Sequence, residues 1–141
     1  MILHASAVQF LGKGLLLLGD SSSGKSDLCL KLIEQGAYLI ADDVVSLRVE
    51  KEGVFLSPLD KNKGLLEVRG LGIYSLPFKE NIPLSYVFYL EEKYERLPKP
   101  EVYEIEGFSF PKIKLNPFEQ SVLIKIKYAL EKKPLPFDAL L

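Results

Sequence analysis

Residues 14–28 read GLLLLGDSSSGKSDL and place four consecutive leucines directly before a turn of glycine, aspartate and serine. The leucines, Leu15–Leu18, predict an interior strand, because a strand that is buried on both faces carries apolar residues without alternation. After the turn, apolar residues recur at helical spacing from Ser26 to Gln35, and Gly36 supplies a stop. This stretch therefore predicts a buried strand, a tight turn and a helix in succession.

The turn matches the phosphate-loop pattern G-x-x-x-x-G-K-[ST] at every specified position. Small residues let backbone N–H groups turn inward around phosphate oxygens, and the N-terminus of the following helix attracts the same anion. Lys25 adds a positive charge for the outer phosphates, and the Ser26 hydroxyl can ligate the accompanying magnesium. The pattern predicts nucleotide binding, without distinguishing ATP from GTP, through Gly19, Asp20, Ser21, Ser22, Ser23, Gly24, Lys25 and Ser26.

The composition is that of a globular chain, since 48% of the 141 residues are hydrophobic and the formal net charge is -1. The lack of a basic excess argues against nucleic acid as a partner. The longest aliphatic run, Leu15–Leu18, is far shorter than the ~20 residues that cross a bilayer. The single cysteine, Cys29, falls in an apolar pattern typical of core packing in a reducing compartment. We therefore expect one soluble, cytoplasmic domain over residues 1–141, with no membrane contact.

Outside the phosphate-loop stretch, alternation and turn residues predict further strands and one more helix. Asn116 can cap a helix that begins at Pro117 and continues through residues 118–133. The tail at residues 134–141 contains two prolines and cannot continue that helix. Strands are expected at residues 2–10, 14–19, 37–49, 54–59, 65–68 and 84–92, with short extended pieces between residues 96 and 115. These elements indicate an α/β fold.

Two adjacent carboxylates, Asp42 and Asp43, interrupt the extended segment that follows the first predicted helix. Two buried carboxylates side by side repel each other, so a metal ion or a reacting hydroxyl would compensate for their burial. The carboxyl end of this strand is expected to face the ligand crevice. One aspartate would then orient Mg²⁺ through water, and the other would accept a proton from an attacking hydroxyl. The alternative is an exposed turn with two solvated acids.

A second group of polar residues lies in LLEVRGLGIYS, residues 65–75, directly after a short apolar strand. Glu67 can ligate magnesium, and Arg69 can steady the charge of a transferring phosphoryl group. The alternative for this segment is a surface ion pair beside a turn. His4 is the sole histidine and lies in an early strand, where a purely structural role is the alternative to a catalytic one.

Together these segments resemble the bacterial HPr kinase/phosphorylase family, in its C-terminal catalytic domain. The resemblance rests on LHAS at residues 3–6, GDSSSGKSDLCLKLIEQGAYLIADD at residues 19–43 and LLEVRGLGIYS at residues 65–75. Residues 110–130, FPKIKLNPFEQSVLIKIKYAL, are similar to the end of the short form of the enzyme, which lacks an N-terminal domain. The resemblance implies a phosphate-loop domain of the HPr kinase and PEP carboxykinase type, with a central mixed β-sheet and flanking helices.

The family transfers the terminal phosphoryl group of ATP, or in some members of pyrophosphate, to a serine of HPr, the phosphocarrier protein of sugar phosphotransferase systems. Many members also catalyse the reverse phosphorolysis, and full-length relatives form hexamers. By motif position, the resemblance implies that Lys25 and the loop hold phosphates and that Ser26 and Glu67 hold Mg²⁺. It also implies that Asp43 or Asp42 is the base that activates the acceptor serine, and we favour Asp43.

The resemblance further matches His4 to a histidine that precedes the phosphate loop in the family. In longer members a basic segment carries an arginine implicated in catalysis, whereas residues 110–120 contain Lys112 and Lys114 and no arginine. Lysine does not reproduce a bidentate phosphate contact. We therefore expect an ATP- and Mg²⁺-dependent serine kinase that acts on an HPr-like carrier protein. A small-molecule hydroxyl kinase on the same scaffold and a non-catalytic ATP-sensing module are the alternatives.

Overall fold

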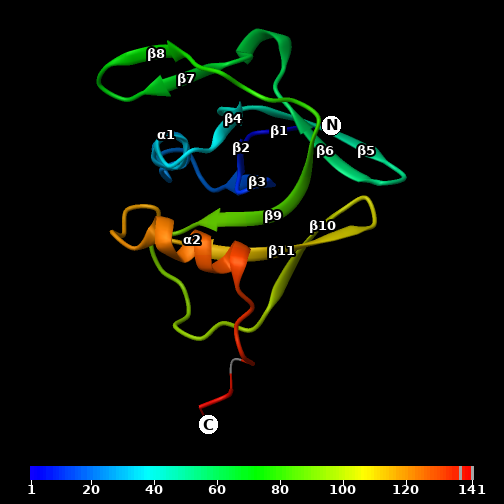
Figure 1. The fold of residues 1–141 in the computed structure, drawn as a ribbon, viewed down its shortest axis with the longest axis vertical. Coiled ribbons are helices and arrows are strands. Elements are labelled where there is room, and N and C mark those ends of the chain that lie inside the picture. The colour runs from blue at the N-terminus through cyan, green and yellow to red at the C-terminus, as the bar shows by residue number, and fades with distance from the viewer. Residues whose placement is uncertain (137, 141) are drawn as a thin grey trace.

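The computed structural model describes residues 1–136 and 138–140, and Figure 1 shows the arrangement of the helices and strands. Helix α1 spans Lys25–Glu34 and helix α2 spans Val122–Glu131. A 3₁₀ turn, η1, covers Asp60–Asn62. The strands are β1 Ile2–Leu3, β2 Ser6–Phe10, β3 Lys13–Leu18, β4 Tyr38–Ala41, β5 Val45–Glu50, β6 Gly53–Ser57, β7 Leu65–Val68, β8 Gly72–Ser75, β9 Ile82–Leu90, β10 Glu101–Ile105 and β11 Phe108–Leu115.

Nine strands form one mixed sheet in the order β1-β5-β6-β9-β3-β2-β4, with β11 paired to β9 and β10 paired to β11. β9 runs parallel to both β3 and β11, whereas the other pairings of this sheet are antiparallel. β9 pairs with β6 near its start and with β11 near its end, so the sheet curls around this strand. β7 and β8 form a separate hairpin, at the top of Figure 1. The expected mixed α/β fold is confirmed.

Two clusters of buried side chains lie on opposite faces of β3. Leu15 and Leu17 belong to the cluster that both helices cover, whereas Leu16 belongs to a second cluster with residues of β5, β6 and the β10–β11 hairpin. Successive side chains of a strand point to opposite faces, and all three leucines are fully buried. The predicted interior strand is therefore confirmed, and each of these leucines contributes roughly 1.5–3 kcal/mol through burial.

The structure subdivides two of the strands expected from the sequence. The segment at residues 2–10 is divided into β1, which pairs with β5, and β2, which pairs with β3 and β4. The segment at residues 37–49 is divided by the Asp42–Asp43 turn into β4 and β5. The short extended pieces expected between residues 96 and 115 form the regular hairpin β10–β11.

The prediction that the second helix begins at Pro117 is wrong, because α2 begins at Val122. The Asn116 side chain closes a turn instead of a helix, since its Oδ1 accepts a hydrogen bond of 2.9 Å from the backbone N–H of Phe118. Lys31 of α1 donates to the carbonyl oxygen of Pro117 at 2.9 Å. This tertiary contact fixes the turn at residues 116–118 against α1.

The chain leaves α2 after Glu131 without further helix through residue 136, as expected for the proline-containing tail. Phe137 and Leu141 of this tail lie outside the described residues. In the part of the chain that the structure describes, no helix has the length and hydropathy that crossing a bilayer requires.

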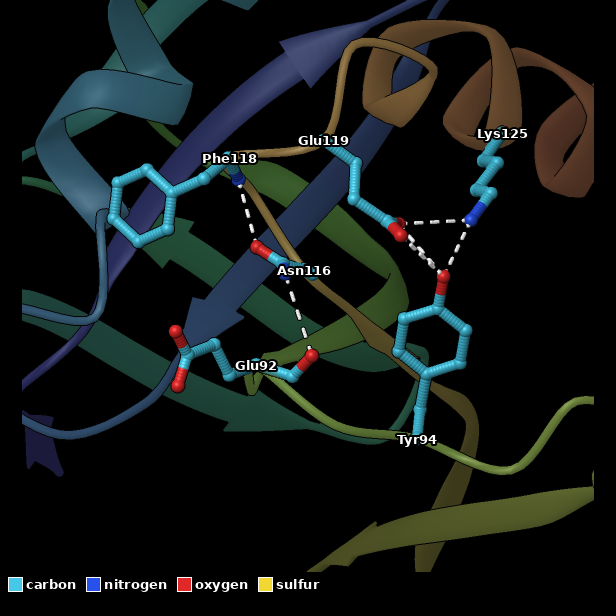
Figure 2. A network of polar contacts seen from close by, with 6 residues as sticks. All are labelled: Glu92, Tyr94, Asn116, Phe118, Glu119 and Lys125. Carbon is cyan, nitrogen blue, oxygen red and sulfur yellow. Dashed lines mark hydrogen bonds and ion pairs between the residues drawn. The ribbon is translucent and has the colours of Figure 1, made fainter.

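A polar cluster joins the loop after β9 to the start of α2 (Figure 2). Tyr94 Oη donates to Glu119 at 2.7 Å, and Lys125 Nζ lies 2.8 Å from Glu119 Oε1 and 2.7 Å from Tyr94 Oη. The hydrogen bonds from Lys125 and then Tyr94 lower the pKa of the Glu119 carboxyl. The hydrogen bonds with Glu119 and Tyr94 raise the pKa of Lys125. The cluster therefore stabilises the fold when both groups are charged.

The lowered pKa of Glu119 predicts a pH-dependent contribution to stability. Its stabilising effect is present above the carboxyl pKa of the unfolded chain and is lost as pH falls through the lower pKa of the folded state. Glu119→Gln should therefore be less stable than the parent protein at pH 7, and the difference should vanish in the acid range. Urea denaturation midpoints of the two proteins at a series of pH values measure this.

Glu95→Gln is the matched control, because Glu95 is an exposed acid of the same loop that takes no part in the hydrogen bonds of the cluster. It should shift the urea midpoint by less than Glu119→Gln at pH 7. A difference between Glu119→Gln and the parent that stays constant from pH 7 into the acid range would contradict the assigned pKa.

Candidate active site

The phosphate loop occupies the connection between β3 and α1, as the sequence predicts. Lys25 folds back across the loop, and its Nζ donates to the carbonyl oxygens of Gly19 at 2.8 Å and Asp20 at 2.9 Å. The backbone N–H of Ser23 donates to the carbonyl oxygen of Asp20 at 3.0 Å, which closes a turn within the loop. The lysine ammonium is thus held at the loop beside the N-terminus of α1, where the helix dipole also favours an anion.

Both glycines of the motif are required by the loop geometry. Gly24 has φ 97°, which disfavours side chains, and a Cβ there would lie 2.9 Å from Pro117 Cγ and 3.0 Å from Phe118 Cζ. Gly19 has φ 153°, and a Cβ there would lie 2.5 Å from Ser23 Oγ. The loop can therefore close against Ser23 and against the turn at residues 116–118 only because these positions carry no side chain.

The carboxylate of Asp42 accepts hydrogen bonds from three segments. Its Oδ1 accepts from the Ser26 hydroxyl at 2.7 Å and from the Ser6 hydroxyl at 3.0 Å, and its Oδ2 accepts from the backbone N–H of Glu67 at 3.4 Å. Asp42 is buried, with 8% of its surface exposed. A buried carboxylate requires such partners, so the end of β4 is tied to the first turn of α1, to β2 and to β7.

Asp43 differs from its neighbour, because it is exposed and has φ 72°. The Val44 N–H donates to the carbonyl oxygen of Asp42 at 2.9 Å, so Asp43 is the central residue of a γ-turn with positive φ, a rare and strained conformation. Its own N–H donates to Ser6 Oγ at 3.1 Å. The turn directs the two adjacent acids into different environments, one buried and one open to solvent.

The side chain of Asn62 holds this turn from both sides. Its Nδ2 donates to the carbonyl oxygens of Asp42 at 3.1 Å and Val44 at 2.9 Å, and its Oδ1 accepts from the Leu59 N–H at 2.8 Å. Three hydrogen bonds from one half-buried amide offset the conformational cost of the positive φ at Asp43.

The other predicted site residues differ in whether they contact the aspartate pair. Glu67 is brought to it, since its N–H contacts Asp42, and its side chain is exposed. Arg69 is exposed just beyond β7, and His4 is exposed at the bend before β2. No hydrogen bond or ion pair joins either side chain to the aspartate pair in the described part of the chain. The structure therefore groups Lys25, Ser26, Asp42, Asp43 and Glu67, with His4 and Arg69 at the margin.

Cys29 lies beneath the site and is fully buried, which confirms its predicted place in the core. Burial and then the negative charge of Asp42 raise the pKa of its thiol, and a hydrogen bond with Ser6 opposes this shift. The thiol is therefore protonated at neutral pH and serves as an apolar packing group.

Two residues of the site, Ser6 and Asn62, carry no assigned role in the sequence analysis. Ser6 is a hydroxyl residue at the start of a largely apolar strand, a weak signal, and it is 1% exposed in the structure. Asn62 belongs to a polar turn without a distinguishing pattern. The sequence does not predict these contacts, because Asp42, which both residues contact, lies on a different element of the fold.

The fold and the site define a phosphate-loop α/β protein in which an aspartate pair meets the first turn of the loop helix. The family model that matches this chain is the HPr Serine kinase C-terminal domain, over residues 1–78. These residues make up more than half of the chain and contain every grouped site residue, so the chain belongs to this family.

Curated relatives extend the similarity beyond the family match. The chain is 34% identical over 122 residues to the HPr kinase/phosphorylase of Caldicellulosiruptor bescii, which covers 77% of this chain and 39% of the relative. It is 32% identical over 127 residues to the HPr kinase/phosphorylase of Bordetella pertussis, which covers 80% of this chain and 41% of the relative. The chain thus spans about two fifths of the length of these relatives.

A solved structure shows the same fold. The HPr(Ser) kinase/phosphatase from Coxiella burnetii matches with a TM-score of 0.78 over 92% of this chain and 88% of that chain, at 23% sequence identity. At this level of identity the similarity demonstrates the fold, and it agrees with the mixed sheet and two helices described above.

The three hydrogen bonds of Asn62 predict a measurable role in stability. Asn62→Ala should lower the free energy of unfolding by about 1–3 kcal/mol, because it releases the strained turn and leaves backbone groups unpaired. Lys61→Ala, an exposed neighbour in the same 3₁₀ turn, should change it by less than about 0.5 kcal/mol. Urea denaturation of both variants measures the difference, and equal effects would contradict the role assigned to Asn62.

Proposed function

We propose that this protein is an ATP- and Mg²⁺-dependent serine kinase that phosphorylates an HPr-like carrier protein. The observation that carries the proposal is the 2.7 Å hydrogen bond between Ser26 and Asp42. It joins the phosphate loop to the aspartate pair, so that a bound phosphate chain and a proton acceptor lie in one site. Membership of the HPr serine kinase family supports the protein acceptor.

The residues present fit a magnesium ion shared with the phosphates. The Ser26 hydroxyl and the Asp42 carboxylate are hard oxygen ligands of the kind that Mg²⁺ prefers, and Glu67 of β7 contacts Asp42 through its backbone N–H. The described residues contain no group of three acidic, histidine or cysteine side chains placed to hold a metal ion, so phosphate and water would have to supply the remaining ligands. When bound, magnesium would neutralise charge on the transferring phosphoryl group.

Asp43 is the base in this proposal. Asp42 already accepts two hydroxyl hydrogen bonds, whereas Asp43 is exposed and positioned by the strained turn. The Asp43 carboxylate would take the proton of the acceptor serine as that oxygen bonds to the terminal phosphorus, and ADP would leave with the electrons of the broken P–O bond. Lys25 would hold the phosphates in line with the acceptor.

His4 is a near neighbour of Ser6 in the chain, and Arg69 is a near neighbour of Glu67. A large acceptor bound over the site would therefore come close to both side chains. Both are exposed, so their role would be to steady the acceptor or the transferring charge when the carrier protein covers them. Use of pyrophosphate, reverse phosphorolysis and assembly into hexamers are further properties proposed from the family resemblance.

Lys25→Ala should weaken ATP binding roughly 10- to 100-fold, because a charge-assisted contact to phosphate is worth about 1.5–3 kcal/mol. The variant should also lose the two hydrogen bonds that Lys25 donates to the carbonyl oxygens of Gly19 and Asp20, which hold the loop closed. Isothermal titration with Mg-ATP measures the affinity. An unchanged affinity would count against the loop as the phosphate site.

Asp43→Asn should leave ATP affinity within about twofold and reduce phosphoryl transfer by about 10²- to 10⁴-fold, since the amide cannot accept the proton. Transfer of label from γ-labelled ATP to HPr measures this, with an HPr whose acceptor serine is alanine as the negative control. Asp60→Asn, at an exposed acid of η1, is the matched control and should retain full transfer.

The same assay separates the protein kinase from its alternatives. Label on a small hydroxyl compound but not on HPr would identify a small-molecule kinase. ATP binding without turnover of any acceptor would identify an ATP-sensing module, and Asp43→Asn would then behave as the parent protein does.

A further inference from the structure

Three parallel strands end side by side at the phosphate loop. Leu18 of β3 is opposite Tyr89 of β9, and Leu90 of β9 is opposite Leu115 of β11. The N–H of Glu91 donates to the carbonyl oxygen of Leu115 at 2.8 Å, which keeps the ends of β9 and β11 together. Ligands of α/β sheets bind beyond the carboxyl ends of parallel strands, so this edge is the place for the part of a nucleotide that extends beyond its phosphates.

A cavity of about 440 Å³ lies at this edge, large enough for a nucleoside. Its described lining residues include no lysine or arginine, and those outside the phosphate loop include two acids, Glu91 and Glu92, so beyond the loop the wall does not attract further phosphate. They also exclude Asp43, Ser26 and Glu67, so the cavity is separate from the place of the acceptor hydroxyl. The lining residues are Asp20, Ser21, Ser22, Ser23, Tyr89, Leu90, Glu91, Glu92, Pro117 and Phe118.

The Phe118 ring forms an aromatic wall of this cavity. Its edge lies against Gly24 of the loop, since a Cβ on that glycine would be 3.0 Å from Phe118 Cζ, yet 60% of the residue is exposed. The turn that carries it is held by Asn116, whose Oδ1 accepts from the Phe118 N–H and whose Nδ2 donates to the Glu92 carbonyl oxygen at 3.3 Å. Figure 2 shows the ring and the Glu92 carboxylate extending to the same side, away from the Tyr94 cluster.

We infer that this cavity binds the nucleoside half of the nucleoside triphosphate, with the base stacked on Phe118 and the ribose hydroxyls donating to Glu91 or Glu92. The inference rests on the proposed use of ATP and assigns the part of that substrate which the phosphate loop does not hold. An exposed aromatic ring on a hydrogen-bonded turn, with its edge against the phosphate loop, loses little conformational entropy when a base stacks on it. Carboxylates suit the hydroxyls of ribose and repel phosphate, so the wall also sets the direction in which the nucleotide lies.

The test compares ATP with inorganic tripolyphosphate, which carries the phosphates without the nucleoside. Isothermal titration of the full chain with Mg²⁺ should show tighter binding of ATP than of tripolyphosphate. Phe118→Ala should weaken ATP binding roughly tenfold, the usual scale for loss of one base stack, and leave tripolyphosphate binding within twofold. Phe118→Tyr should retain ATP affinity. Tyr128→Ala removes an equally exposed aromatic residue of α2 outside this cavity and should change neither affinity.

Each other outcome overturns the inference. Equal losses of ATP and tripolyphosphate in Phe118→Ala would show that the ring only supports the loop, and an unchanged ATP affinity would show that it does not touch the base. If the parent protein binds ATP no more tightly than tripolyphosphate, the nucleoside site is refuted while the proposed phosphoryl transfer stands. If it binds neither ligand, the inference and the proposed function are both refuted.

Discussion

The buried carboxylate of Asp42 is the constraint on which the candidate site depends. It accepts hydrogen bonds from β2, from the first turn of α1 and from β7, and its carbonyl oxygen accepts a further bond from Asn62. Leaving such a buried group unpaired costs about 1–3 kcal/mol for each lost partner. The four segments therefore keep a common geometry, and the loop helix cannot move relative to the aspartate turn without breaking several of these bonds together.

This constraint also gives the two aspartates different chemistry. Asp42 is occupied by hydroxyl donors, whereas the γ-turn leaves Asp43 exposed at the same strand end. The phosphate loop lies between this acidic end and the aromatic cavity at Phe118. A long ligand bound along the loop would thus meet two different surfaces, the exposed Asp43 at one end and a cavity with an aromatic wall at the other, and this difference would favour one orientation of the ligand.

The sequence predicts the contiguous part of the site well, because residues 19–26 and the helix after them are defined by local pattern. Ser6 and Asn62 escape prediction because they act across 36 and 20 positions of the chain on Asp42. The start of α2 is mispredicted because Asn116-Pro117 suits a tight turn as well as a helix N-terminus. The contact between Lys31 and Pro117 decides between them, and no local signal contains it.

The hydrogen bond from Lys31 to Pro117 spans 86 positions, and it has a consequence for the order in which the molecule is made. The phosphate motif is synthesised before β9 and before the turn at residues 116–118, which follows only on the order of ten seconds later at typical rates of translation. Until then β3 lacks its parallel neighbour β9, and the loop lacks the contact of Gly24 with Pro117 and Phe118. A ligand that requires both the loop and the cavity wall at Phe118 could therefore bind only after the turn at residues 116–118 has been synthesised, and the earlier nascent segment would have to avoid aggregation without it.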